Sequence, residues 1–132
     1  MKTLTKLNFL LATLIIGSFI FLASCEKPEI GGTGGDYTMV CFPQHNGGGL
    51  YLDTIYIRYN SSEPPATGLS GYDVTIVGDT TEEHVHCPGL KAGFYYIYAS
   101  GTDTLSHLAF HGGMPVMISG SEKERDVNIV VK

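Results

Sequence analysis

The sequence contains no tryptophan and few basic residues. It has 8 Lys and Arg against 13 Asp and Glu, which gives a formal net charge of −5 at pH 7. A nucleic-acid-binding domain needs a basic stripe for phosphate contacts, so we expect no nucleic-acid partner. The absence of tryptophan removes the largest aromatic side chain that can stack on a ligand.

Catalytic motifs are absent as well. The chain has no Gly-x-Ser-x-Gly turn, no phosphate-binding glycine loop before a helix, no Cys-x-x-Cys pair and no His-Glu-x-x-His pattern. Beyond residue 24, no window keeps apolar residues at helical spacing. We therefore expect neither an enzyme nor a helical domain, and no cofactor.

The first 24 residues have the pattern of a signal peptide. Two lysines within residues 1–6 precede the uncharged stretch LNFLLATLIIGSFIFLAS, residues 7–24. A charged start and an apolar stretch are typical of secretory signals, although this stretch is also nearly long enough to span a bilayer. Its end decides between the two, because the residues that follow form the tetrapeptide LASC, residues 22–25.

The LASC tetrapeptide resembles the lipobox of bacterial lipoproteins. The resemblance implies that lipid is attached to the sulfur of Cys25, that residues 1–24 are removed, and that Cys25 begins the mature chain. Several acyl chains would hold the protein durably on a membrane. Loss of Lys2 and Lys6 changes the formal charge from −5 to −7.

The segment after the cysteine predicts a tether and a location. Residues 25–35, CEKPEIGGTGG, are charged and then glycine-rich, which is typical of a flexible linker. In Gram-negative lipoproteins an aspartate after the cysteine resembles an inner-membrane retention signal, and here that residue is Glu26. We therefore expect an envelope protein anchored in the outer membrane, with the face of the membrane left open.

The remaining residues, 36–132, predict one all-β domain. Short aromatic and β-branched segments with period-two alternation are separated by glycine- and proline-rich breaks. Seven or eight short strands in one domain favour a β-sandwich. The expected strands are residues 37–42, 51–60, 72–78, 84–87, 94–100, 104–110, 115–119 and 126–132.

Two of these segments carry a family resemblance. Gly89, Leu90, Gly93 and Tyr95 fall on a Gly-Leu-x-x-Gly-x-Tyr pattern, and residues 126–131 read Asp-Val-x-Ile-x-Val. This arrangement resembles the carboxypeptidase regulatory-like and transthyretin-like domains. The resemblance implies a single Ig-like or transthyretin-like Greek-key β-sandwich, a fold that serves many functions without fixing one.

The strand after the Gly-x-Tyr pattern predicts an interaction face. In the family pattern the tyrosine points into the core, so Tyr95, Ile97 and Ala99 are expected to face inward. Alternation then exposes aromatic residues on the outer face, where they mark a contact surface unless another segment covers them or the register is reversed. The candidate face consists of Phe94, Tyr96 and Tyr98, with Tyr56 as a cross-strand neighbour.

His84 and His86 are candidate metal ligands. Strand residues two apart share a face, so the two imidazoles form half of a zinc site, which another histidine or a carboxylate could complete. The alternative is that Val85 enters the core while both histidines face solvent beside two glutamates. We favour this second interpretation and expect no metal. The histidines available to complete a site are His45, His107 and His111.

Two cysteines remain after Cys25. Cys41 and Cys87 form either a disulfide, as an oxidising compartment favours, or two reduced thiols buried in the core. We favour the reduced thiols slightly.

Two classes of function fit these observations. The first is a non-catalytic binding or structural module on a membrane anchor, with an envelope protein as partner. The second is a module that binds glycan or another small ligand at the cell surface, with the eight tyrosines as stacking platforms.

The lipobox makes a direct prediction. Cys25→Ser removes the thiol that would accept the lipid, so the variant should accumulate as an uncleaved precursor. The mass of the N-terminal peptide shows whether the signal is cleaved and the lipid attached, and detergent partitioning shows whether the protein behaves as membrane-anchored. A variant that is still cleaved and still partitions into detergent would show that Cys25 is not the lipidated residue.

Overall fold

The computed structural model describes residues 29–51, 53–103 and 106–132. The predicted signal peptide, Cys25 and the first residues of the predicted tether lie outside these residues. In the described part of the chain, no helix is long and apolar enough to cross a membrane.

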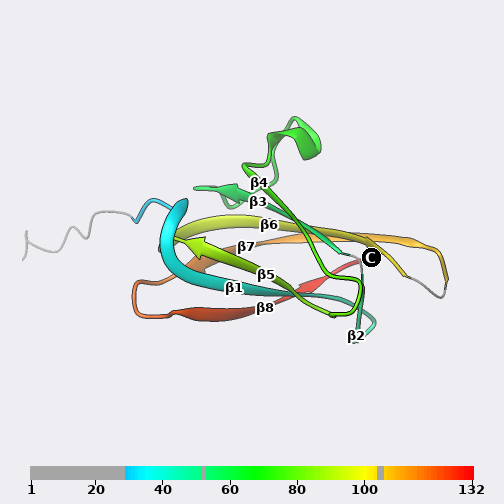
Figure 1. Ribbon diagram of the computed structural model, residues 1–132. Coiled ribbons are helices and arrows are strands. Elements are labelled where there is room, and N and C mark those ends of the chain that lie inside the picture. Colours follow the sequence, from blue (N-terminus) through cyan, green and yellow to red (C-terminus); the bar gives the residue numbers. More distant parts are fainter. Residues whose placement is uncertain (1–28, 52, 104–105) are drawn as a thin grey trace, which may run out of the picture.

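Two sheets pack face to face, which confirms the predicted all-β sandwich (Figure 1). In the first sheet, β1 (Thr33–His45) lies between β5 (Val85–Leu90), which is antiparallel to it, and β8 (Glu124–Val130), which is parallel. The short strand β2 (Gly48–Gly49) pairs with the end of β1. The Ig-like, transthyretin-like and Greek-key character within this class stays a prediction.

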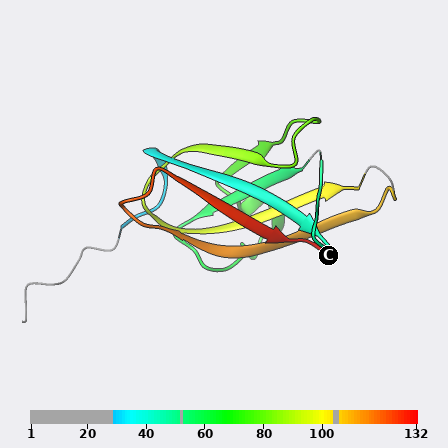
Figure 2. The same cartoon turned by 90° about the horizontal axis from the view of Figure 1, so that it is seen from below.

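The second sheet has the order β4-β3-β6-β7. All its neighbouring strands are antiparallel. Figure 2 shows β1 and β8 side by side on the other sheet. The bounds of the four strands are β3 Thr54–Tyr59, β4 Val74–Val77, β6 Gly93–Thr102 and β7 Ala109–Ile118.

Alternate residues of each strand form the core between the sheets. On β6, Tyr95, Ile97 and Ala99 are all 0% exposed, which confirms the predicted inward face. Ile55 and Ile57 of β3 lie opposite Ala99 and Ile97 and are equally buried. Cys41, Cys87 and Ile129 face them from the first sheet.

The sheet begins earlier than predicted. Residues 33–35, which were assigned to the tether, are the start of β1. Gly35 approaches β5 so closely that a Cβ there would lie 2.0 Å from the carbonyl oxygen of Leu90. The Gly32 N–H donates to the hydroxyl of Tyr95 at 2.9 Å. Both glycines therefore belong to the packed fold, and Gly35 permits close contact between backbones.

β1 also continues past its predicted end at Pro43, as far as His45. Its last partner on β5 is opposite Cys41, so Pro43 lies where that neighbour has ended. A strand with an unpaired side tolerates a residue that lacks an N–H. The following glycines complete a tight hairpin, with Asn46 and Gly47 at positive φ.

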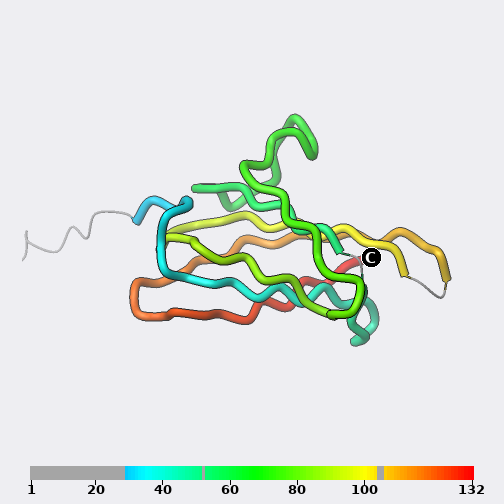
Figure 3. Tube along the Cα trace, viewed as in Figure 1, coloured from blue at the N-terminus to red at the C-terminus, as the bar shows by residue number. Residues whose placement is uncertain are grey.

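The predicted strands 104–110 and 115–119 are wrong as two separate elements. A single strand, β7, covers Ala109–Ile118, and it joins β6 through a hairpin (Figure 3). Gly112 does not break it, because this residue stays paired with Ala99 of β6. β8 passes so close that a Cβ at Gly112 would lie 2.2 Å from the carbonyl oxygen of Val130. Gly112 and Gly113 thus mark a close approach between strands and not a turn.

The buried carboxyl of Asp53 gives the folding stability an unusual dependence on pH. It is 2% exposed, and its Oδ1 has no hydrogen-bond partner among the described residues. Burial raises its pKa from 3.8 to about 6. The folded protein therefore binds this proton more tightly than the unfolded chain, so the carboxyl lowers stability above pH 6 and ceases to do so below about pH 4.

We predict that Asp53→Asn raises the free energy of unfolding at pH 7 by up to about 3 kcal/mol, because the amide carries no charge to bury. This gain should shrink as the pH falls to 4. Urea denaturation at the two pH values measures it, with Asp126→Asn, at an exposed position of β8, as the control. An equal effect of Asp53→Asn at both pH values would contradict the prediction.

Candidate functional site

Tyrosine rings gather on the outer face of the second sheet. Tyr56 of β3 lies directly opposite Tyr98 of β6, with ring centroids 5.9 Å apart. Tyr72 contacts both, at 5.6 Å from Tyr56 and 6.0 Å from Tyr98. Tyr96 follows on the same face of β6 and is half-buried like the others. We call these four residues the tyrosine face.

Strict alternation along residues 72–78 would place Tyr72 on one face with Val74 and Ile76, but the structure differs. Val74 and Ile76 do pack against the core, but the Tyr72 ring lies with the outer tyrosines. Asp73 fixes this arrangement, because its N–H donates to the Ile57 carbonyl and its carboxylate accepts the Tyr59 N–H. The alternation of inward and outward side chains therefore starts only after Asp73.

An apolar end continues the tyrosine face along β6 and β7. Phe94 and Met117 are opposite each other in the register, and each is 51% exposed. Between them and Tyr98, the Tyr96 ring lies over Gly113, where a Cβ would come within 2.7 Å of the tyrosine hydroxyl. The missing side chain of Gly113 thus makes room for the ring.

A shallow groove of about 590 Å³ begins at the other end of the face. The Tyr98 ring forms part of its wall, and the His111 ring packs against Tyr98 at 6.0 Å. Three hydroxyl side chains also line it, so the groove combines an aromatic surface with hydrogen-bonding groups. The hydroxyls belong to Thr54, Ser100 and Thr102.

Two phenol groups of this face, those of Tyr72 and Tyr98, have pKa values above the ordinary value of tyrosine. Burial, followed by the neighbouring tyrosines Tyr96 and Tyr98, raises the pKa of Tyr72 to about 12. Burial also raises the pKa of Tyr98. The face is therefore uncharged at these rings and can offer hydrogen-bond donors to a ligand.

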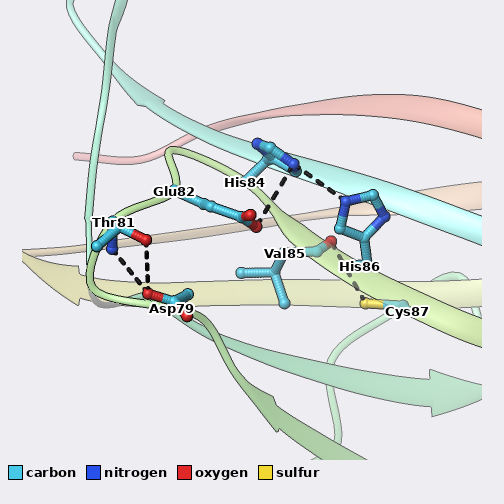
Figure 4. Close-up of polar contacts among 7 residues, drawn as sticks. All are labelled: Asp79, Thr81, Glu82, His84, Val85, His86 and Cys87. Carbon is cyan, nitrogen blue, oxygen red and sulfur yellow. Dashed lines mark hydrogen bonds and ion pairs between the residues drawn. The ribbon is translucent and has the colours of Figure 1, made fainter.

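His84 and His86 meet on the outer side of the first sheet (Figure 4). Their Nε2 atoms are 3.0 Å apart, and Oε2 of Glu82 lies 3.7 Å from Nε2 of His84. Val85, between the histidines, is 4% exposed and packs into the core. The shared face predicted for the two imidazoles is thus present, and a carboxylate joins it.

The other three histidines do not reach this cluster. His45 packs against Phe110 with ring centroids 3.9 Å apart, and its Nδ1 lies 3.2 Å from the Val131 carbonyl oxygen. His111 lies on the second sheet beside Tyr98. His107 is exposed in the connection between β6 and β7. None of the three histidines available to complete a site therefore joins His84 and His86.

Cys41 and Cys87 are both free and 0% exposed. Hydrogen bonding with Cys87 and burial raise the pKa of the Cys41 thiol. A neutral, enclosed thiol is a poor nucleophile, because the thiolate is the reactive form. The two cysteines therefore act as small core residues.

Sequence reasoning found part of these sites. It identified Tyr56, Tyr96 and Tyr98 but missed Tyr72, whose neighbour Asp73 was the available indication of a bend. It left open that a carboxylate could be a ligand but could not place Glu82 beside His84, since that carboxylate lies in a loop whose path no periodicity predicts. Comparison with protein families, curated proteins and solved structures finds no match to this chain.

Because the thiols are buried, we predict that a thiol reagent modifies them only after the protein is unfolded. In the native protein neither Cys41 nor Cys87 should react, because both side chains are enclosed. After unfolding in denaturant without reductant, both should react. Mass spectrometry of the peptides carrying each cysteine distinguishes them from Cys25, and a disulfide-linked peptide pair would contradict the prediction.

Proposed function

We propose that this protein is a membrane-anchored lipoprotein of the bacterial envelope that acts as a non-catalytic binding or structural module. The observation that carries the proposal is the tyrosine face, with Phe94 and Met117 at its apolar end. Aromatic rings contribute strongly to binding when they are buried in an interface. A flat face of this kind suits a protein partner in the envelope.

The predicted anchor supports the same function. The LASC tetrapeptide implies a lipid on Cys25, and Glu26 favours the outer membrane over the inner one. β1 begins at Thr33, so only a few residues separate the predicted lipid from the sandwich. Such an anchor would keep the tyrosine face close to the membrane surface, where envelope partners are found.

The groove beside Tyr98 favours a second candidate, binding of a glycan. A sugar presents an apolar ring face and several hydroxyls, which match the Tyr98 ring and the hydroxyls of Thr54, Ser100 and Thr102. Because the groove and the apolar end lie at opposite ends of the face, different substitutions test the two candidates.

We predict that the double substitution Phe94→Ser with Tyr96→Ser abolishes binding of the envelope partner. Crosslinking in native membranes should then no longer capture that partner. Both side chains point away from the core, so the free energy of unfolding should fall by no more than about 1 kcal/mol. Crosslinked products are counted by mass spectrometry, and stability is measured by urea denaturation.

Val130→Ser is the matched control, since Val130 is 67% exposed but lies on β8 in the other sheet. It should leave capture unchanged. Equal loss of capture in both variants would contradict the role of the tyrosine face. Binding to a glycan array that is lost in Tyr98→Ala, with no protein captured, would establish the second candidate instead.

A further inference from the structure

Three lone-pair-bearing atoms converge at the start of β5, on a surface separate from the tyrosine face. They are Oε2 of Glu82 and the Nε2 atoms of His84 and His86, and all lie within 4.8 Å of one another. We propose that Glu82, His84 and His86 bind a divalent transition-metal ion, for which zinc is the test ion. This site does not depend on the proposed function.

The spacing of the two imidazoles fits a shared metal ion. Zinc binds histidine nitrogen at about 2.0–2.1 Å, so two nitrogens on one tetrahedral ion lie about 3.3 Å apart. The observed separation of 3.0 Å between the Nε2 atoms is close to this value. The carboxylate of Glu82 is half-exposed, so a change in its side-chain torsions is enough to bring an oxygen to the ion.

A proton can join only two of these three atoms at a time. Nε2 of His84 faces both Nε2 of His86 and the carboxylate of Glu82. A proton on His84 can be donated to His86 or to Glu82, and the third atom then has no partner within the cluster. A cation at the centre accepts a lone pair from all three atoms.

The fold fixes the backbone that carries the two histidines. Burial of Val85 in the core fixes the strand, so His84 and His86 project from its other side. The preceding loop is closed by Asp79, whose Oδ1 accepts the Thr81 N–H at 2.9 Å and the Thr81 hydroxyl at 2.8 Å (Figure 4). This turn directs the chain into Glu82, and a preformed ligand set loses less entropy on binding an ion.

The neighbouring glutamate has a different partner. Glu83 accepts a hydrogen bond from the Tyr51 hydroxyl at 2.7 Å and lies against Gly49. It is therefore held away from the histidines, although it is adjacent to both Glu82 and His84 in sequence. Glu83 provides a matched control for the role of Glu82.

The ligand types select the class of ion. Two imidazoles and one carboxylate suit zinc, copper or nickel, whereas calcium and magnesium require mostly oxygen ligands. Three protein ligands leave one position of a tetrahedral zinc ion for water. The cluster lies at the protein surface, which gives an ion and that water access from solvent.

The test uses the full-length protein in detergent, freed of metal with a chelator and titrated with Zn²⁺ against a chromophoric competitor. We expect one high-affinity Zn²⁺ per chain. His84→Ala and His86→Ala should each lower the affinity by roughly tenfold or more, and Glu82→Gln should lower it as well. Glu83→Gln should keep the wild-type affinity.

His107→Asn is the control for loss of a histidine, because His107 is exposed and its positive φ of 54° suits asparagine. Thermal melts without metal verify that each variant is folded; if an alanine variant is not, His84→Gln and His86→Gln replace it. Added Zn²⁺ should raise the melting temperature of the wild type and of both controls only. If the wild type binds Zn²⁺ no more tightly than a variant that carries both His84→Ala and His86→Ala, the proposal is overturned.

Discussion

The period of two along β6 is the constraint on which the rest of the structure depends. β6 pairs with β3 on one side and β7 on the other, so its register fixes the faces of three strands. Burial of Tyr95, Ile97 and Ala99 leaves the outer face to Phe94, Tyr96 and Tyr98. A slip of one residue would exchange these sets, bury Phe94 and expose the Tyr95 ring, which now fills the core.

Most of the strands, and the faces of β5 and β6, could be predicted from the sequence because both depend on local alternation. The roles of the glycines could not. Gly35 and Gly112 lie where a carbonyl of another strand comes within about van der Waals contact, and nothing near them in sequence indicates that strand. Glycine is read as flexible or turn-forming when its partner is unknown, which placed the start of β1 too late and divided β7 in two.

The candidate sites also combine features that alternation predicts with features that it does not. His84 and His86 share a face because residues two apart in a strand do so, and the sequence was enough to predict it. Glu82 joins them through a loop shaped by the contacts of Asp79 with Thr81, and Tyr72 joins the outer tyrosines through the hydrogen bonds of Asp73. Irregular segments are set by individual side-chain bonds, which have no period to detect.

The parallel pairing of β1 with β8 also has a consequence for how the chain folds. Thr38 pairs with Glu124 and Gln44 with Val130, so the first strand needs a neighbour from nearly the far end of the domain. Joining such distant residues costs loop-closure entropy and slows folding. Until β8 has left the ribosome, β1 lacks one neighbour, so the first sheet closes only after that strand has emerged.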